Sequence, residues 1–336
     1  MLNAAIVGLG RWGQNLVNHI QGKSDKIRVT LGVLRHPENA RAYAHAKGFP
    51  LVDSLDKALA DPGIDAIILA TPHTAHAEQI IACAKAGKPV FTEKPFTLTT
   101  ESAKAALRAC AQAKVTLGVG YNWRYQPALL EIRRMIEDGT LGRVLHIEGN
   151  FCGPSAYRFP KGHWRHDTQE VPAGGMTGRG VHVIDAMLSL AGPIEQVSAQ
   201  SFRLAQDFRA DDTTSMLLRF ARGATGYLGT VIASAETWRM QVFGSNGWAQ
   251  VGDVEHLTTW DLSTCMIDRE HITLKQRPIV RSFPKTSTER AELEHFAKQA
   301  AARQPLALPG GDAVHNVAVL QAIVDSIATQ QPVRVA

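Results

Sequence analysis

The sequence lacks several features that would place the chain in a special class. No uninterrupted apolar stretch approaches the roughly 20 residues that a membrane-spanning helix needs. Because the first residues already have the pattern of a buried strand, we expect no signal peptide. Cysteine is scarce and shows no CxxC or other metal-ligand spacing, so we expect buried, reduced thiols in a cytoplasmic protein. The four cysteines are Cys83, Cys110, Cys152 and Cys265.

Dense basic runs and metal-binding patterns are also missing. Lys and Arg number 36 against 31 Asp and Glu, giving a formal net charge of +5, and the basic residues are spread along the chain. Nucleic-acid-binding proteins usually gather such residues in a patch, so we expect no nucleic-acid partner. The mild basicity instead favours an anionic ligand, such as a phosphate-rich cofactor. None of the 13 histidines forms an HxxxH helix pattern with acidic company, and we expect no metal.

The 336 residues exceed what one hydrophobic core usually supports, which predicts two domains. The first part alternates short apolar runs with helical patterns. That alternation is typical of an α/β domain, in which helices cover both faces of a mostly parallel sheet. The strand-like runs lie at 4–7, 28–34, 66–70, 89–92 and 115–119.

The second part lacks long helices between most of its strand-like runs. Turn signals separate these runs, which predicts a mostly antiparallel sheet in an α+β domain. We therefore assign residues 1–121 to the first domain and 122–336 to the second, whose last helices can pack back on the first. The runs lie at 144–152, 195–202, 213–220, 224–234 and 239–244.

A glycine-rich loop follows the first predicted strand and precedes a predicted helix. It reads Gly8-Leu9-Gly10-Arg11-Trp12-Gly13. In such a loop the first glycine permits a tight turn, the second lets the backbone approach a pyrophosphate, and the third lets the helix pack closely on the strand. The helix N-terminus adds N–H donors and partial positive charge. The loop therefore predicts a Rossmann fold that binds a dinucleotide.

The end of the second strand bears on which dinucleotide binds. An acidic residue is expected there for NAD, but the position holds Leu34, followed by Arg35 and His36. Arg35, with His36 or Arg11, could pair with a 2′-phosphate. We therefore expect NADP to be preferred, with NAD possible. The alternative is that Arg35 is a solvated loop residue and NAD binds through other contacts.

Further segments carry a recognisable set of motifs. They are Ala70–His76, the Thr92-Glu93-Lys94-Pro95 motif, Asn122-x-Arg124-Tyr125-x-Pro127, Gly174–Asp185, Glu292–Phe296 and the Asp312–Thr329 helix. With the glycine loop, they resemble the glucose–fructose oxidoreductase / inositol dehydrogenase / MocA (Gfo/Idh/MocA) family over nearly the whole chain. The Glu-Lys-Pro motif is the most specific single element of the resemblance.

The resemblance implies a Rossmann domain followed by an α+β domain with a large open sheet. It also implies hydride transfer between a nicotinamide and a carbinol or carbonyl carbon of a sugar, cyclitol, dihydrodiol or related polyol. Family members often associate through the open sheet, so we expect a homodimer or homotetramer.

Lys94 is the first candidate catalytic residue. Oxidising an alcohol requires a base for the hydroxyl proton and a positive group near the developing alkoxide. Lys94 follows a buried strand of the parallel sheet, at the edge where ligand crevices form. The resemblance implies that Lys94 hydrogen-bonds the substrate hydroxyl and that Glu93 positions the cofactor or Lys94.

His182 is the second candidate, because its ordinary pKa suits acid–base work near neutral pH. Asp185 shares its helix face and is a candidate for substrate contact, or it simply orients the helix. The family often has an aspartate four residues before this histidine, where the chain has Gly178. Arg179, beside it, would suit a carboxylate-bearing substrate or could face solvent.

The remaining candidates come from loops at strand ends. Tyr121, Trp164 and Arg165 are predicted to contact substrate, and Asn122 to contact substrate or the nicotinamide ribose. Arg124 is either a site residue or a structural one. The full cofactor set is Gly8, Gly10, Arg11, Trp12, Gly13, Arg35, His36, Thr71, Pro72, His73, His76, Glu93, Lys94 and Asn122.

Two other functions remain open on the same fold. One is a non-catalytic NADP-binding sensor or regulator, although relatives of that kind tend to lose the lysine. The other is an NAD-dependent glycosidase that keeps its cofactor bound through turnover, which Arg35 makes less natural. The presence of both Lys94 and His182 favours the dehydrogenase or reductase.

Overall fold

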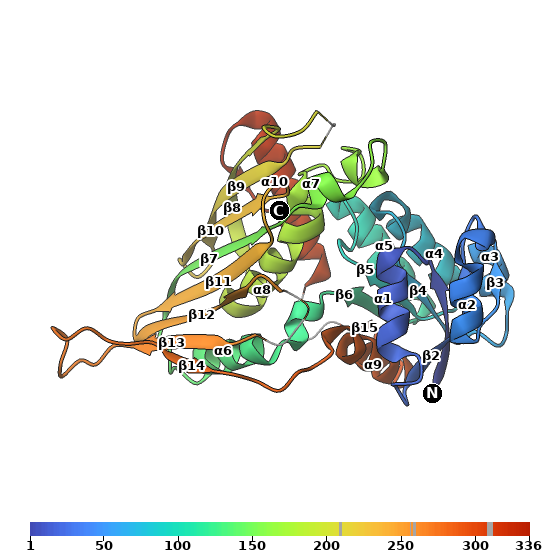
Figure 1. The fold of residues 1–336 in the computed structure, drawn as a ribbon, viewed down its shortest axis with the longest axis horizontal. Helices are drawn as coiled ribbons and strands as arrows, with labels where there is room; N and C mark the ends of the chain where they lie inside the picture. The colour runs from blue at the N-terminus through green and yellow to red at the C-terminus, as the bar shows by residue number, and fades with distance from the viewer. Residues whose placement is uncertain (208–209, 256, 258–259, 308–311) are drawn as a thin grey trace. The chain divides into compact units, whose positions relative to one another are not determined.

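The computed structural model describes residues 1–207, 210–255, 257, 260–307 and 312–336. The chain divides into two compact units (Figure 1). Unit 1 comprises Met1–Asn122 and Ser287–Pro309, and unit 2 comprises Trp123–Thr286 and Gly310–Ala336. The sequence-based boundary after residue 121 lies one residue from the first crossing, and a later segment returns to unit 1.

Unit 1 is built on one parallel sheet, with strand order β15-β6-β5-β4-β1-β2-β3. Apart from β15 this is the doubly wound order, whose ligand crevice lies at the carboxyl ends of the strands where the order reverses. The Rossmann prediction is thus confirmed. The strands are β1 (Leu2–Val7), β2 (Ile27–Val33), β3 (Leu51–Val52), β4 (Ala66–Leu69), β5 (Val90–Glu93), β6 (Leu117–Gly120) and β15 (Leu306–Ala307).

Helices cover this sheet, and its central strands are buried. Every residue of β4 and β5 is buried. The late helix α9 contributes to the same core, where the rings of Phe91 and Phe296 lie 5.8 Å apart between centroids. The helices of unit 1 are α1 (Arg11–Ile20), α2 (Arg41–Lys47), α3 (Leu55–Ala60), α4 (His76–Lys85), α5 (Thr100–Ala113) and α9 (Thr288–Ala301).

Unit 2 contains a nine-stranded sheet of order β14-β13-β12-β11-β7-β10-β9-β8-β16. All its neighbouring strands are antiparallel except β7 and β10, so the prediction of a mostly antiparallel sheet is confirmed. The strands are β7 (Val144–Cys152), β8 (Ile194–Phe202), β9 (Thr213–Phe220), β10 (Thr225–Val231), β11 (Thr237–Gly244), β12 (Gly247–Asp253), β13 (Leu262–Met266), β14 (Ile279–Arg281) and β16 (Val333–Arg334).

The two faces of this sheet differ in what covers them. Helices α8 and α10 pack along one face (Figure 1). Residues of β9 alternate between buried and accessible, as expected for a sheet that is covered on one side only. The accessible side carries Leu217 and Tyr227, which are direct partners in neighbouring strands and are 64% and 42% exposed. The helices of unit 2 are α6 (Pro127–Glu137), α7 (Ser155–Arg158), α8 (Val181–Ala191) and α10 (Ala313–Thr329).

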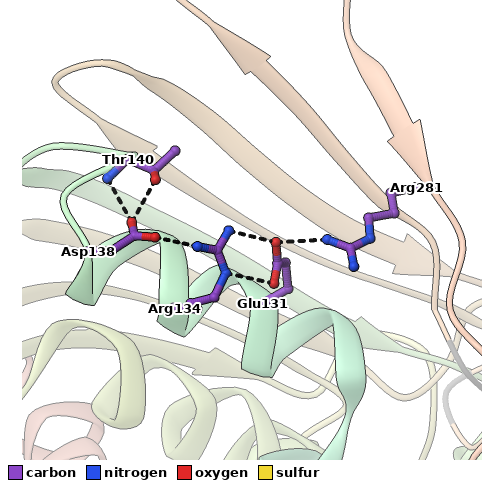
Figure 2. A network of polar contacts seen from close by, with 5 residues as sticks. All are labelled: Glu131, Arg134, Asp138, Thr140 and Arg281. Atoms are coloured by element: carbon purple, nitrogen blue, oxygen red, sulfur yellow. Dashed lines mark hydrogen bonds and ion pairs between the residues drawn. The ribbon is translucent and has the colours of Figure 1, made fainter.

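A charged network on the outer side of α6 connects this helix to the edge strand β14. Figure 2 shows Arg134 between Glu131 and Asp138, with Arg281 on the same glutamate. The hydrogen bond from Arg134 lowers the pKa of Glu131, and the charge of Arg281 adds to the effect. Solvent-accessible pairs of this kind contribute little free energy each, so we expect the network to add little to the stability of the fold.

Candidate active site

The glycine loop has the geometry that a dinucleotide requires. Gly8 has φ +91°, and a Cβ there would lie 2.5 Å from the Ala70 carbonyl oxygen. A Cβ on Gly13 would lie 2.0 Å from the Gly8 carbonyl oxygen. These two positions must therefore be glycine if helix and strand are to pack this closely.

Gly10 differs from the other two glycines of the loop, because a Cβ on it would meet no described atom within 4 Å. It is also the N-cap of α1 and has no side chain with which to cap the first-turn N–H groups. Open backbone at a helix N-terminus suits a pyrophosphate. The loop thus fits a dinucleotide, as the motif predicts.

The end of β2 carries the residues expected to read the ribose. The strand ends at Val33, and Leu34 is half-buried directly after it. Arg35 and His36 are exposed, and a ring nitrogen of His36 lies 3.3 Å from the Glu38 carboxylate. No carboxylate occupies the Leu34 position itself, so the choice of NADP over NAD stays a prediction.

The segment after β4 holds two neighbouring loops together. His76 is fully buried, and its ring nitrogens lie 2.9 Å from the Pro95 carbonyl oxygen and 3.1 Å from that of Thr71. Thr71 also donates its hydroxyl to Gln79 at 2.7 Å, while His73 is buried beside His76. His76 therefore connects the loops that follow β4 and β5, which favours a positioning role. The cofactor contacts predicted for this segment remain predictions.

The Glu-Lys-Pro motif follows β5 directly. Glu93 is the last residue of the strand and is 5% exposed, with Oε2 accepting the Lys94 backbone N–H at 3.2 Å. The Lys94–Pro95 peptide bond is cis, and Lys94 is half-buried. A Cβ on Gly120, the neighbour of Glu93 in β6, would lie 3.1 Å from its carboxyl group, so this glycine leaves room for the carboxylate.

Glu93 has an unusual electrostatic environment. Burial raises the pKa of its carboxyl group, while the adjacent Lys94 charge and the indole N–H of Trp12 oppose the rise. The carboxylate of Glu289 in α9 adds to it. A buried carboxylate beside a lysine, at the carboxyl edge of a parallel sheet, is a strong functional-site signature because structure alone gains little from burying a charge.

In unit 2, His182 is the second residue of α8 and is buried. Its ring stacks on Trp123, with centroids 5.4 Å apart and planes inclined by 23°. Trp123 in turn packs against Phe151, Trp238 and Trp260. The candidate acid–base residue is thus held by an aromatic cluster that fixes the plane of its imidazole.

Asp185 lies one helical turn beyond His182 and forms a buried ion pair. Arg124 donates to its two oxygens at 2.7 and 2.8 Å, and Asn316 donates to the same carboxylate at 3.4 Å. Of the two interpretations left open for Arg124, this pair supports the structural one. The carboxylate is used inside the protein, which favours a positioning role for Asp185 over the predicted substrate contact.

The glycine-rich segment that precedes His182 is helical. Residues Met176–Gly180 form a π-helical turn that runs into α8. A Cβ on Gly180 would lie 2.0 Å from the Met176 sulfur, so this glycine serves packing. Gly178, where the family often has an aspartate, differs, because a Cβ there would meet only the Arg165 guanidinium, at 3.7 Å.

Arg179 and Arg165 have different surroundings. Arg179 pairs with Glu236 at 2.7 Å, donates to the Cys152 carbonyl oxygen at 2.9 Å and lies over the Phe151 ring. Because its charge is already compensated, Arg179 is poorly suited to bind a substrate carboxylate. Arg165 stacks over the Trp164 ring, 4.4 Å from its centroid, and both side chains are half-buried as expected at a rim.

Several residues that shape these surroundings were not identified from the sequence. Thr288 and Glu289 begin α9, and their sequence pattern is that of an ordinary helix start. Trp123 is a large apolar residue of the kind that usually packs in a core. Glu236 gives no local signal at all. Tyr121, predicted to contact substrate, is buried with 1% exposure. Only the fold, which brings distant segments together, reveals these relationships.

Metal sites and membrane-spanning helices are absent from the residues that the structure describes. Across that part of the chain, no group of three or more His, Cys, Asp or Glu side chains could hold a metal ion. Within the same residues, no helix combines the length and apolar character needed to cross a membrane.

Both parts of the chain match models of one protein family. Residues 2–121 match the oxidoreductase family with an NAD-binding Rossmann fold, and residues 129–250 match the GFO/IDH/MocA C-terminal domain. Inositol 2-dehydrogenase of Rhizobium meliloti is 27% identical over 342 residues, which cover 98% of each protein.

Two solved structures share the fold. A candidate NADPH-dependent oxidoreductase from Desulfitobacterium hafniense has a TM-score of 0.90 and 24% identity, covering 99% of this chain and 97% of that one. Levoglucosan dehydrogenase in complex with NADH and L-sorbose has a TM-score of 0.88 and 22% identity, covering 100% and 99%. With both of its domain models matched, the chain belongs to the Gfo/Idh/MocA family of oxidoreductases.

Proposed function

We propose that the protein is an NAD(P)-dependent dehydrogenase or reductase that acts on a CH–OH group of a sugar, cyclitol, dihydrodiol or related polyol. The observation that carries the proposal is the Glu93–Lys94 pair directly after β5, in a unit whose glycine loop is built for a dinucleotide. The names of the relatives, which include inositol and levoglucosan dehydrogenases, support the substrate class.

When bound, the nicotinamide supplies the hydride acceptor or donor. Lys94 then hydrogen-bonds the reacting hydroxyl and stabilises the negative charge that develops on its oxygen. Glu93 accepts the Lys94 backbone N–H, and its carboxyl group lies beside the Lys94 charge. Within unit 2, His182, whose ring plane is fixed by Trp123, is the proposed acid–base residue.

The preferred cofactor in this proposal is NADP. Arg35 and His36 are exposed directly after β2, where a 2′-phosphate would lie, and Leu34 offers no carboxylate to repel it. Arg11, exposed at the start of α1, is a further arginine of unit 1 proposed to contact the cofactor.

Trp164 and Arg165 are proposed to form the substrate rim. An indole face and a guanidinium stacked together suit the apolar face and the hydroxyls of a polyol. Tyr121 and Arg179 are better placed to support the site than to contact substrate, because one is buried and the other is paired with Glu236.

The uncovered face of the unit 2 sheet is proposed to join copies of the chain into a homodimer or homotetramer. Leu217, Tyr227 and Phe202 expose large apolar surface on that side. The four cysteines are free, which fits the proposed cytoplasmic location.

A panel of substrates tests the proposal. Sugars, cyclitols, dihydrodiols and keto acids are incubated with NADP, NAD or their reduced forms, and the absorbance of the reduced nicotinamide is followed. We expect turnover with at least one polyol. Absence of turnover across the panel, in protein that binds the cofactor, would favour a sensor over an enzyme.

A further inference from the structure

A buried chain of hydrogen bonds links the first turn of α9 to the end of β6 in unit 1. The Thr288 hydroxyl donates to Glu289 Oε2 at 3.2 Å, and the Asn122 amide Nδ2 donates to the Thr288 oxygen at 3.1 Å. The three side chains belong to residues that are at most 2% exposed. Water therefore cannot rearrange these hydrogen bonds, and the protein groups alone decide the direction of the chain, that is, which atom donates and which accepts.

The chemistry of each group fixes that direction. A carboxylate only accepts, so the Glu289 oxygen requires the Thr288 hydroxyl to donate. Once its hydrogen is used, the Thr288 oxygen can only accept, and it takes an N–H of Asn122. The amide of Asn122 is thus held with Nδ2 toward Thr288 and Oδ1 facing away.

The buried carboxylate that sets the direction is well supported. Asn15 in α1 donates to Glu289 Oε1 at 3.5 Å, and His19 lies 3.9 Å from Oε2. Glu289 also stands in the first turn of α9, where the helix dipole favours negative charge. Glu289 Oε1 therefore accepts a hydrogen bond from Asn15, and Oε2 accepts one from Thr288.

The chain of hydrogen bonds that starts at Glu289 ends at the amide oxygen of Asn122. Asn122 Oδ1 is buried and has no hydrogen-bond partner among the described residues. A buried amide oxygen left without a donor is destabilising, so its retention calls for an explanation. A ligand donor would supply one.

We propose that Glu289 and Thr288 are positioning residues that orient Asn122, so that Oδ1 accepts a hydrogen bond from the nicotinamide half of the bound cofactor. This inference rests on the proposed function. Asn122 follows β6, which lies on the opposite side of the β4–β1 switch point from the predicted ribose reader after β2. A dinucleotide spans such a switch point, so the β6 side receives the nicotinamide half. The carboxamide N–H and the ribose hydroxyls are the donors that this half could offer to Asn122 Oδ1.

The test compares whole dinucleotides with fragments that lack the nicotinamide. Dissociation constants are measured by calorimetry for NADPH and 2′-phospho-ADP-ribose, and for NADH and ADP-ribose. Thr288→Val removes the hydroxyl while conserving shape, which frees Asn122 to turn. We expect it to weaken the whole dinucleotides about tenfold, equivalent to one hydrogen bond of about 1.4 kcal/mol, and to leave the fragments unchanged.

Two further variants separate orientation from folding. Thr288→Ser keeps the hydroxyl and should bind all four compounds as the wild type does. Glu289→Gln offers an N–H to Thr288, which lets the hydroxyl reverse, and it should weaken the dinucleotides selectively. Unchanged fragment binding shows in each case that unit 1 is folded.

Equal weakening of fragments and dinucleotides in Thr288→Val would overturn the inference, because the chain would then be merely structural. Unchanged binding of the whole dinucleotides by Thr288→Val would also overturn the inference. These outcomes are separate from the proposed function, since they are read from binding. A wild type that binds both dinucleotides but turns over no substrate would contradict the function and leave the orienting chain standing. A wild type that binds neither would contradict both.

Discussion

Arg124 holds Asp185 by two hydrogen bonds in the interior of unit 2, one helical turn beyond His182. The pair connects the segment before α6 to the first turns of α8. Asn316 of α10 adds a third contact to the same carboxylate. The buried charge pair therefore helps to place the first turns of α8, which carry His182.

Removing one partner of this pair should be costly. Asp185→Asn leaves the Arg124 charge buried without its counter-ion, and we expect a loss of about 3–5 kcal/mol in the free energy of unfolding. The double variant Arg124→Met with Asp185→Leu should recover much of that loss. Urea unfolding measures both. The exposed pair Arg133–Glu137 is the control, and Arg133→Gln should cost under about 1 kcal/mol. A loss for Asp185→Asn no larger than the control's would contradict this account of the pair.

The buried carboxyl group of Glu93 should make the free energy of unfolding depend on pH. Burial raises the pKa of its carboxyl group above the ordinary value of 4.5, so folding favours the neutral form. The stability it contributes is fully present below pH 4.5 and is lost as the pH rises through the raised pKa. Above the raised pKa, the buried charge of Glu93 lowers the free energy of unfolding.

Glu93→Gln should therefore be more stable than the wild type at pH 8, with a free energy of unfolding higher by on the order of 1 kcal/mol. This difference should shrink toward pH 5. Turnover should fall, because Lys94 loses its charged neighbour. Urea unfolding at the two pH values checks the first expectation. The exposed Glu78→Gln is the matched control and should show neither effect. A variant that is less stable at pH 8 than at pH 5, relative to the wild type, would show that the sign is wrong.

Arg35 should govern the choice of cofactor. Arg35→Ala removes a cation from the predicted 2′-phosphate position, and we expect NADPH binding to weaken about tenfold with NADH unchanged. Fluorescence titration of both reduced cofactors measures the ratio. Lys104→Ala removes an exposed charge from α5 of the same unit and should leave the ratio as it is. Tighter binding of NADH by the wild type, with no response to Arg35→Ala, would make NAD the cofactor.

The uncovered sheet face should control assembly. A double change of Leu217 and Tyr227 to glutamate places two charges on adjacent strands of that face, where they are directly paired. We expect light scattering to give the mass of one chain for this variant and a multiple of it for the wild type. Leu130→Glu, on an exposed position of α6 (49%), should retain the wild-type mass. A monomeric wild type would refute assembly through this face.

Much of the fold followed from local patterns. Continuous apolar runs such as Ala66–Leu69 predicted buried parallel strands. Turn signals between strand-like runs such as Thr213–Phe220 predicted a mostly antiparallel sheet. The return of α9 to unit 1 was harder, because its apolar residues only show that it packs against something. Its partner, Phe91, lies far away in the sequence.

The site was predictable where chemistry depends on one short segment. The glycine loop and the Glu93–Lys94 motif carry their own signals, since the backbone geometry of each is local. The pairs Arg124–Asp185 and Arg179–Glu236 were not predictable, because each joins segments at least 57 residues apart. The same holds for the orienting chain from Glu289 to Asn122, whose meaning depends on which atoms donate.

Hydride transfer is the central claim, and kinetics on three proteins test it most directly. The rate of reduced-nicotinamide formation or loss is measured on the best polyol substrate for the wild type, Lys94→Ala and His182→Ala, with the dissociation constant for the cofactor determined in parallel. We expect kcat to fall roughly 10²–10⁴-fold in both variants while cofactor binding is kept. Full turnover in Lys94→Ala would contradict the account.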